Sequence, residues 1–258
     1  MHNLVLVAVM LSACTSGVTD LASLTQRVVG ITATDRDSII VDLTFDGITS
    51  VVDHNCATLA VNASINGVPF QRAEQGHWTG PTLGGNQGYC TFPNFWTNAI
   101  PPGPTTIEIA DPTATISITL PDLSFARSMD LTPTPSFHSG DTLAIRFASA
   151  PTDQVASVEI SATTPKAMVP DPQTQGYCGN EMFFTSVKPN GNSATFAVPD
   201  VYAKWMQTGC DYVLTKGQSA PVNFDLKLAV YPQISRCEGA DCNAIHTTAS
   251  KATGTYVP

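Results

Sequence analysis

Short runs in which apolar and polar residues alternate at a period of two recur along most of this chain. Residues 38–45 are rich in β-branched and aromatic side chains, and at residues 59–65 every second position is apolar. An Asn66-Gly67 pair follows, which predicts a tight hairpin because both central residues of a type I′ turn need positive φ. This pattern predicts strands and constrains the chain to an all-β fold.

The strand pattern continues through the rest of the chain. Residues 106–110 and 114–120 flank Asp111-Pro112-Thr113, where the proline interrupts a strand ladder and favours a turn. Further strands are predicted at residues 141–147, 155–162, 182–187, 194–198, 211–215 and 222–230. Only residues 200–207 have a helix-like pattern.

Residues 123–139 interrupt the pattern with a run rich in proline and threonine, which is typical of a stiff, extended connector. We therefore predict a linker there, between a first β-sandwich domain at residues 26–122 and a second at residues 140–258. Several short strands in each of two segments of about 100 residues are typical of β-sandwiches. The strand rhythm and residues 139–143 resemble the immunoglobulin-like and fibronectin type III-like modules of bacterial surfaces. The expected fold is thus two tandem Ig-like β-sandwiches.

The N-terminus resembles the signal peptide of a bacterial lipoprotein. An apolar run at residues 4–11 is too short for the roughly 20 residues of a membrane-spanning helix. The run ends in Leu11-Ser12-Ala13-Cys14, which is similar to a lipobox. The resemblance implies that residues 1–13 are removed, that Cys14 is acylated with palmitate or a similar chain, and that residues 14–25 form a flexible tether.

The residue after Cys14 bears on the location of the anchored protein. Thr15 stands where lipoproteins retained on the inner membrane of diderm bacteria usually have Asp. The resemblance therefore implies a lipid-anchored protein of the cell envelope, at the outer membrane. Met1-His2-Asn3 lacks the Lys or Arg that signal peptides carry before the apolar run.

The cysteine count is consistent with an exported chain. There are seven cysteines, and acylation of Cys14 would leave an even set of six. Disulfides persist outside the cytoplasm, although a sequence alone does not fix their connectivity. Nearest-neighbour pairing predicts three bridges, Cys56–Cys90, Cys178–Cys210 and Cys237–Cys242.

Charge and composition exclude several classes of partner. The chain is 43% hydrophobic and only 13% charged, so it has enough apolar material for a core. Its net charge of −9 repels nucleic acid and anionic lipid head groups. We expect no nucleic-acid partner, and membrane contact only through the acyl chain.

Motifs for known chemistry are largely missing from the sequence. There is no nucleophile elbow, HExxH helix, phosphate-binding loop, EF-hand loop or paired CxxC motif. Cys237, Cys242 and His246 have ligand types that suit zinc, but two cysteines this close more often form a disulfide in an oxidising compartment. We therefore expect a bridge there, a solvated His246, no metal and no cofactor.

Two further clusters have a possible chemical and a simpler structural interpretation. His138, Ser139 and Asp141 contain the residue types of a catalytic triad, but triad members normally converge from distant segments, so a polar turn is favoured. Asp35, Asp37, Asp42 and Asp46 could suggest calcium, yet they lack the spacing of a known loop and straddle an apolar run. Solvated carboxylates explain them.

The first long segment without a strand pattern, residues 71–86, is the best candidate recognition surface in the sequence. Loops longer than about 12 residues in compact domains are often functional. His77 and Trp78 lie in it, and an exposed Trp could stack on a sugar or anchor a protein. The alternative is that Trp78 folds back onto the sandwich.

Two functional classes follow from these patterns. The leading hypothesis is a non-enzymatic envelope lipoprotein whose modules bind or support a protein or glycan partner. The rival is a membrane-anchored exported hydrolase with dispersed catalytic residues, for which a deep pocket holding His54, His77 or His138 beside a carboxylate would be the structural sign. No catalytic residue can be assigned from the sequence.

Overall fold

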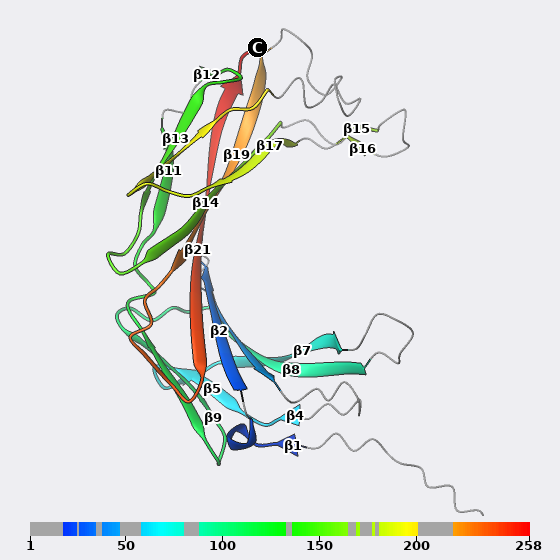
Figure 1. Ribbon diagram of the computed structural model, residues 1–258, viewed down its shortest axis with the longest axis vertical. Coiled ribbons are helices and arrows are strands. Elements are labelled where there is room, and N and C mark those ends of the chain that lie inside the picture. Colours follow the sequence, from blue (N-terminus) through cyan, green and yellow to red (C-terminus); the bar gives the residue numbers. More distant parts are fainter. Residues whose placement is uncertain are drawn as a thin grey trace, which may run out of the picture.

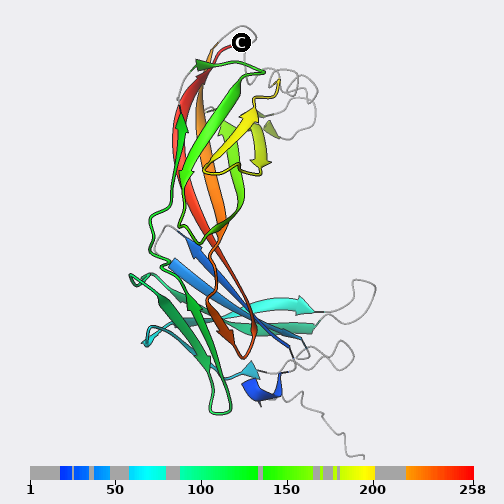
Figure 2. The same cartoon turned by 60° about the vertical axis from the view of Figure 1, so that its left-hand side comes forward.

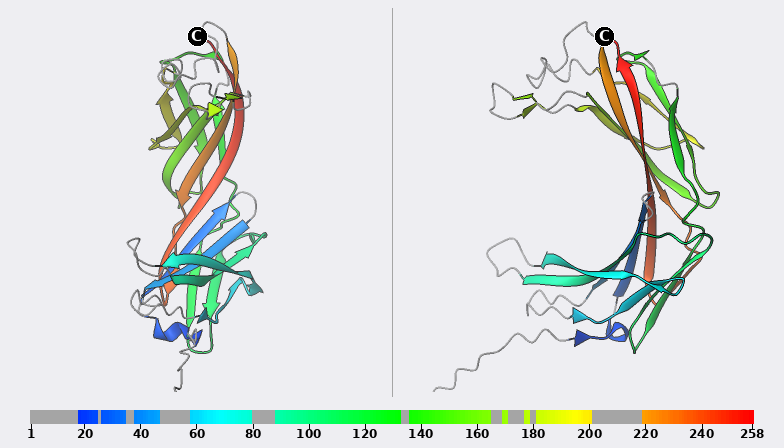
Figure 3. Two further views of the ribbon diagram at one scale, coloured as in Figure 1. Left: turned by 90° about the vertical axis from the view of Figure 1, so that its right-hand side faces the viewer. Right: turned by 180° about the vertical axis from the view of Figure 1, so that it is seen from behind.

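Strands make up almost all of the regular secondary structure among the described residues, which confirms the predicted all-β fold. The computed structural model describes residues 18–24, 26–34, 38–46, 58–79, 88–132, 136–164, 169–170, 177–178, 181–200 and 219–258. These residues form an elongated crescent with one lobe at each end (Figures 1 and 3). Each lobe is a sandwich of sheets around its own cluster of buried apolar residues.

The C-terminal lobe has an immunoglobulin-like arrangement, as the strand rhythm predicts. Its outer layer is a three-stranded sheet in the order β11 (Ser128–Thr132), β13 (Thr142–Ala148) and β18 (Ser193–Ala197). Its inner layer has the order β17 (Glu181–Val187), β14 (Gln154–Thr163), β19 (Ala220–Tyr231) and β21 (Asp241–Tyr256).

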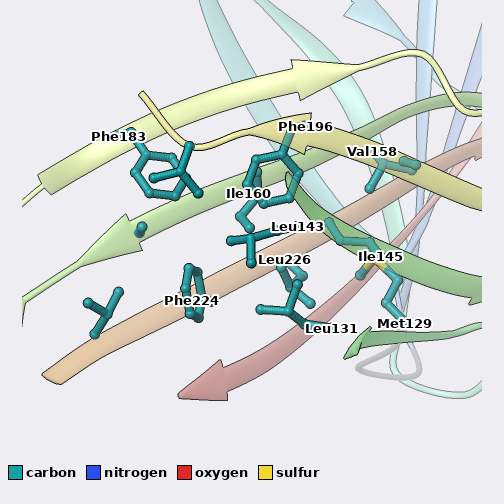
Figure 4. Packing of buried hydrophobic residues seen from close by; sticks show 14 of the residues in the cluster. Met129, Leu131, Leu143, Ile145, Val158, Ile160, Phe183, Phe196, Phe224 and Leu226 are labelled. Carbon is teal, nitrogen blue, oxygen red and sulfur yellow. The ribbon is translucent and has the colours of Figure 1, made fainter. Parts of the chain in front are cut away.

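Alternation along these strands places every second side chain in the C-terminal core (Figure 4). Leu143 and Ile145 of β13 are buried on one layer, and Phe224 of β19 is buried on the other. The Phe224 ring lies 5.5 Å from that of Phe137 and 6.5 Å from that of Phe183, in tilted pairs. Burial of each such side chain contributes about 1.5–3 kcal/mol.

The segment at residues 123–139, predicted as a linker, is largely part of the two lobes. Leu123 is buried in the N-terminal core, β11 pairs with β13, and β12 (Ser136–Phe137) pairs in parallel with the end of β21. The segment therefore changes from one sheet of the sandwich to the other. Its prolines fall between two short strands, where no long ladder is interrupted. Only residues 124–127 join the lobes at this point.

The N-terminal lobe pairs a five-stranded sheet with the other half of the large sheet. The five-stranded sheet has the order β20 (Arg236–Glu238), β10 (Thr115–Leu120), β9 (Thr105–Ala110), β5 (Asn62–Ile65) and β6 (Val68–Pro69). The opposing layer holds β2 (Gln26–Thr34), β3 (Ser38–Asp46), β8 (Gly88–Thr97) and β7 (Gln71–Thr79).

Both hairpins predicted in this lobe are present. Asn66 and Gly67 turn between β5 and β6 with φ of 47° and 80°, the positive values that a type I′ turn requires. Asp111 turns between β9 and β10, where its carboxylate accepts hydrogen bonds from the N–H groups of Thr113 and Ala114.

The long strand β21 belongs to both lobes (Figure 2). Residues 241–247 pair in parallel with residues 28–34 of β2, and residues 246–256 pair antiparallel with residues 220–230 of β19. A single nine-stranded sheet therefore runs through both lobes and lines the concave side of the crescent (Figures 1 and 3). Its order is β17-β14-β19-β21-β2-β3-β8-β7, with β12 also paired to β21.

The N-terminal sandwich is completed by two strands late in the chain, β20 in one sheet and the first half of β21 in the other. Ala244 of β21 is buried in the N-terminal core, and Ile234, Ala240 and Cys242 pack against that core. In the sequence, all four fall in the range 140–258 that was predicted to be the second domain. The N-terminal lobe of the structure therefore includes part of the predicted second domain. These residues are brought into it by the pairing of β2 with β21, which leaves no local pattern in the sequence.

The segment predicted as a tether, residues 14–25, enters the fold before its end. Leu21, in the 3₁₀ turn η1 (Leu21–Ser23), and Leu24 are buried in the N-terminal core. The N–H of Leu21 donates to the Asp111 carboxylate, and the N–H of Ala22 donates to the Thr113 hydroxyl. Any tether after Cys14 is therefore shorter than predicted.

Two short strand pairs complete the described elements. β1 (Val18–Thr19) pairs in parallel with β4 (Thr58–Leu59), and β15 (Val169–Pro170) pairs antiparallel with β16 (Tyr177–Cys178). Among the residues described, no helix has the length and apolar character needed to cross a membrane.

Candidate functional site

A cavity of about 680 Å³ opens on the nine-stranded sheet, where β21 passes between the two lobes. Most of its lining comes from outward-facing positions on five neighbouring strands, since alternate residues of a strand point to opposite faces. They include Thr34 of β2, Glu159 and Ser161 of β14, Phe184 of β17, and Lys227 of β19. A cavity of this volume falls in the range of sites that bind small ligands.

Strand register places the lining residues in rows across the sheet. Phe184, Ser161, Asp225 and Lys251 are successive cross-strand partners on β17, β14, β19 and β21. In the next row, Glu159 lies opposite Lys227. The sequence pattern predicts the outward direction of the polar residues on β19, but it gives no strand for residues 241–256 and no role for Phe184.

The charges in these rows neutralise one another. Lys227 Nζ lies 3.5 Å from Glu159 Oε2, and Lys251 Nζ lies 3.5 Å from Asp225 Oδ1. All four side chains are at least partly exposed, so each ion pair adds at most about 1 kcal/mol to stability. Their effect on the site is to leave a lining with two charges of each sign.

A second cavity, of about 320 Å³, lies on the N-terminal lobe beside β5, β6 and β9. Arg72 and Glu108 line it together with the apolar side chains of Phe70 and Phe95. The Arg72 Nη1 donates a hydrogen bond of 2.8 Å to the Val61 carbonyl, which ties its guanidinium to the neighbouring strand. This cavity is the smaller of the two.

The predicted recognition loop is in large part a strand. Residues 71–79 form β7, and the backbone of Trp78 lies opposite Tyr89 of β8 while that of His77 lies opposite Cys90. The expectation of a loop at these positions is therefore wrong. The side chains of His77 and Trp78 lie outside the described part of the chain, so their predicted binding role stays a prediction.

Cys237 and Cys242 form the predicted disulfide. The bridge joins β20 to the start of β21 and closes the short turn that contains Gly239, whose φ is 82°. A Cβ at Gly239 would lie 3.0 Å from the Thr115 carbonyl oxygen, so a side chain there would press on β10. The zinc interpretation fails at these cysteines because their sulfurs are bonded to each other.

His246 does not have the solvated position expected from the sequence. It lies on β21, where the strand passes from one lobe to the other, and its side chain is buried. Within the described ranges, no group of three or more His, Cys, Asp or Glu residues is placed to hold a metal ion.

The triad-like cluster is a polar turn before β13. The Asp141 carboxylate accepts hydrogen bonds from the His138 N–H, at 2.7 Å, and from the His138 ring, at 3.2 Å. These bonds lower the pKa of Asp141. The Ser139 hydroxyl is 2.9 Å from that of Tyr256, so Ser139 has a structural partner at the end of β21 rather than a catalytic base.

Several predicted positions lie outside the described residues. These are Cys14, Asp35, Asp37, His54, Cys56 and Cys210, together with the predicted helix-like residues after Asp200. The backbones of Asp42, Asp46, Cys90 and Cys178 belong to β3, β8 and β16, but their side chains are not described. The bridges Cys56–Cys90 and Cys178–Cys210 therefore stay predictions.

The sequence matches no model of a known protein family and no curated protein. Among solved structures, one that matches is that of the FN1–FN3 domains of chicken CNTN1. The match covers 89% of this chain and 66% of the CNTN1 chain, with 8% sequence identity and a TM-score of 0.30. The Yersinia pseudotuberculosis adhesin InvE matches 90% of this chain and 58% of its own, with 10% identity and a TM-score of 0.25. This chain spans less than two thirds of either. Both likenesses are too distant to carry an argument about function.

Proposed function

We propose that this chain is a bacterial envelope lipoprotein, anchored through acylated Cys14, that binds or supports a protein or glycan partner and catalyses no reaction. The observation that carries this proposal is the shared strand β21, which makes one continuous sheet of the concave faces of both lobes. A β-sheet resists bending along its strands far more than a flexible linker does. Such a crescent is suited to hold one binding face at a fixed orientation to its anchor.

The buried N-terminal turn supports a short connection to the membrane. Leu21 lies seven residues after Cys14, and an extended chain of that length spans at most about 25 Å. An acyl chain on Cys14 would therefore keep the η1 end of the N-terminal lobe close to the membrane surface. The C-terminal lobe would then lie at the far end of the crescent, away from the bilayer (Figure 1).

The acidic composition supports an anchor that works through its acyl chains. A net charge of −9 opposes adsorption to anionic lipid, so membrane attachment would depend on acylation. Thr15 supports the outer membrane as its location, by the resemblance to lipoproteins of diderm bacteria.

The buried ion pair between Arg127 and Asp153 supports a structural rather than a catalytic role for these two residues. The buried guanidinium of Arg127 and carboxylate of Asp153 are bonded to each other and to the surrounding backbone, and such saturated groups are poorly placed to exchange protons with a substrate.

Metabolic labelling tests the anchor. Cells that express the full chain would be grown with an alkyne analogue of palmitate, and we expect label on the wild type and none on Cys14→Ala. Thr15→Asp is the matched variant for location: it should keep the label but move the protein to the inner-membrane fraction. Absence of label on the wild type, or its retention in Cys14→Ala, contradicts the anchor.

The non-enzymatic part of the proposal has its own test. Purified full chain would be incubated with isolated cell envelopes, and release of soluble sugar or peptide would be measured. We expect no release above that of a heat-denatured sample. Release that one substitution abolishes would support the hydrolase instead.

A further inference from the structure

The cavity on the nine-stranded sheet has a lining whose chemistry restricts what can bind there. Its two Lys side chains each face a carboxylate across the strands, Lys227 with Glu159 and Lys251 with Asp225. A charged ligand would have to separate one of these ion pairs to obtain a side chain of opposite charge. A ligand without net charge avoids that competition, so the lining favours a neutral occupant.

Hydroxyl groups supply the hydrogen-bonding capacity that remains in the cavity. Ser161 of β14 and Thr247 of β21 line it. A hydroxyl both donates and accepts a hydrogen bond, so these side chains suit a partner that also carries hydroxyl or amide groups. A purely apolar partner would leave these polar groups dehydrated and without a hydrogen bond, which costs free energy.

The cavity lining also contains an exposed aromatic ring. Phe184 is 56% exposed although it is a large hydrophobic residue, and it lines the cavity from the edge strand β17. It lies in the same row as Ser161 and Asp225. An aromatic face packs well against a flat apolar surface, such as the C–H face of a pyranose ring.

We propose that this cavity binds a neutral oligosaccharide, with one sugar ring stacked on Phe184 and its hydroxyls bonded to the Thr and Ser side chains of the neighbouring strands. Neutral sugars combine an apolar ring face with a hydroxyl rim and carry no charge, which suits a lining of one exposed aromatic ring, hydroxyl groups and charges that are already paired. This inference deepens the binding role proposed above and rests on it for its biological setting. The binding itself does not depend on acylation.

The test uses the purified full chain and an array of neutral oligosaccharides of glucose, mannose, galactose and N-acetylglucosamine. Sulfated and uronic-acid glycans and extended peptides are placed on the same array. We expect saturable binding to at least one neutral glycan. Binding to none of them, or preferential binding to the charged glycans or the peptides, overturns the proposal.

Variants then locate the site, with the best neutral glycan titrated by calorimetry. Phe184→Ala should weaken binding about ten-fold through loss of the stacked apolar surface, and Phe184→Trp should retain it. Tyr231→Ala is the matched control, since Tyr231 is an aromatic of similar exposure, 48%, on β19 but outside the cavity lining. An equal loss in both Ala variants, or none in Phe184→Ala, overturns the assignment.

Ionic strength tests the charge argument separately. Affinity should change by less than about two-fold between 50 and 500 mM NaCl, because salt screens interactions with charged ligands and not with neutral ones. A steep loss with salt contradicts a neutral occupant. Since all these measurements use purified protein, a failure of glycan binding is distinguishable from a failure of Cys14 acylation, which is scored in cells.

Discussion

Arg127 and Asp153 form a two-point ion pair where the chain passes from the N-terminal to the C-terminal lobe. The Arg127 Nε lies 2.8 Å from Asp153 Oδ2, and its Nη2 lies 2.9 Å from Oδ1, with both side chains fully buried. Arg127 Nη1 also donates to the Phe125 carbonyl at 3.0 Å, and Asp153 accepts the Ala150 N–H at 2.9 Å. The four-residue connector is thereby fixed to the turn between β13 and β14.

Removal of one partner from this pair should be costly. We expect Arg127→Met to lower the free energy of unfolding by about 3–5 kcal/mol, because it leaves the Asp153 carboxylate buried without its counter-charge. Urea denaturation measures the loss. Arg236→Met is the matched control: Arg236 pairs with Glu238 at 2.6 Å, but both are largely exposed, so its loss should cost far less than that of Arg127. Similar losses in the two variants would contradict the structural role of the buried pair.

Asp111 should make the N-terminal turn sensitive to acid. Burial would raise the pKa of its carboxyl, but hydrogen bonds from Leu21, Thr113 and Ala114 outweigh that effect and lower the pKa to about 2. A lowered folded-state pKa contributes stability above the unfolded value of 3.8, and that contribution is lost as the pH falls from about 4 to 2.

The acid effect is measured as a difference between variants. Wild type should be more stable than Asp111→Asn at pH 6, and the difference should shrink toward pH 2. Hydrogen exchange at the Leu21 amide provides a local readout, since that N–H donates to Asp111. Asp20→Asn is the control, because Asp20 is the exposed residue just before η1 and its side chain makes no capping hydrogen bond to that turn. A constant difference between wild type and Asp111→Asn across this range would contradict the pKa argument.

The disulfide between Cys237 and Cys242 should contribute modestly to stability. Because it closes a loop of only a few residues, loop-closure entropy predicts about 2 kcal/mol. Cys237→Ala/Cys242→Ala should show that loss, and peptide mapping of the wild type without reductant should find the two cysteines cross-linked. Zinc bound in stoichiometric amount with free thiols at both positions would contradict the bridge.

The two lobes should unfold together, since they share β21. Leu226→Ala removes a fully buried side chain from the C-terminal core and should cost about 2–5 kcal/mol. Hydrogen exchange of β9 in the N-terminal lobe should accelerate together with that of β13 in the C-terminal lobe. Asn223→Ala, at an exposed position of the same strand, should change neither. Faster exchange confined to β13 would mean that the lobes are independent.

Local patterns predict the elements of this fold better than their partners. The Asn66-Gly67 turn and the alternation in β13 and β19 depend on near neighbours, and both are present as expected. The pairing of β2 with β21 depends on residues more than 200 positions apart, and nothing near Val28 or Asp241 indicates it. The boundary between the lobes differs from the prediction for this reason.

The candidate site, like the fold, depends on strand pairings that local sequence patterns do not predict. Outward-facing polar residues on β19 can be predicted from their alternation, but the cavity forms only when β2, β14, β17 and β21 lie beside that strand. Exposed Phe184 sits next to buried Phe183, and the sequence alone does not say which of the two faces the core. A strand assignment for residues 241–256 would have been the most useful missing signal.

The late position of residues 236–247 in the chain also sets the order of assembly. Synthesis from the N-terminus delivers β2, β9 and β10 early, yet the strands that complete their sheets, β20 and the first half of β21, come after the whole of β19. Until then, β2 and β10 each have a strand edge that lacks its native neighbour, and exposed strand edges pair readily with other chains. The lobe whose strands come first in the chain is therefore the last to be completed.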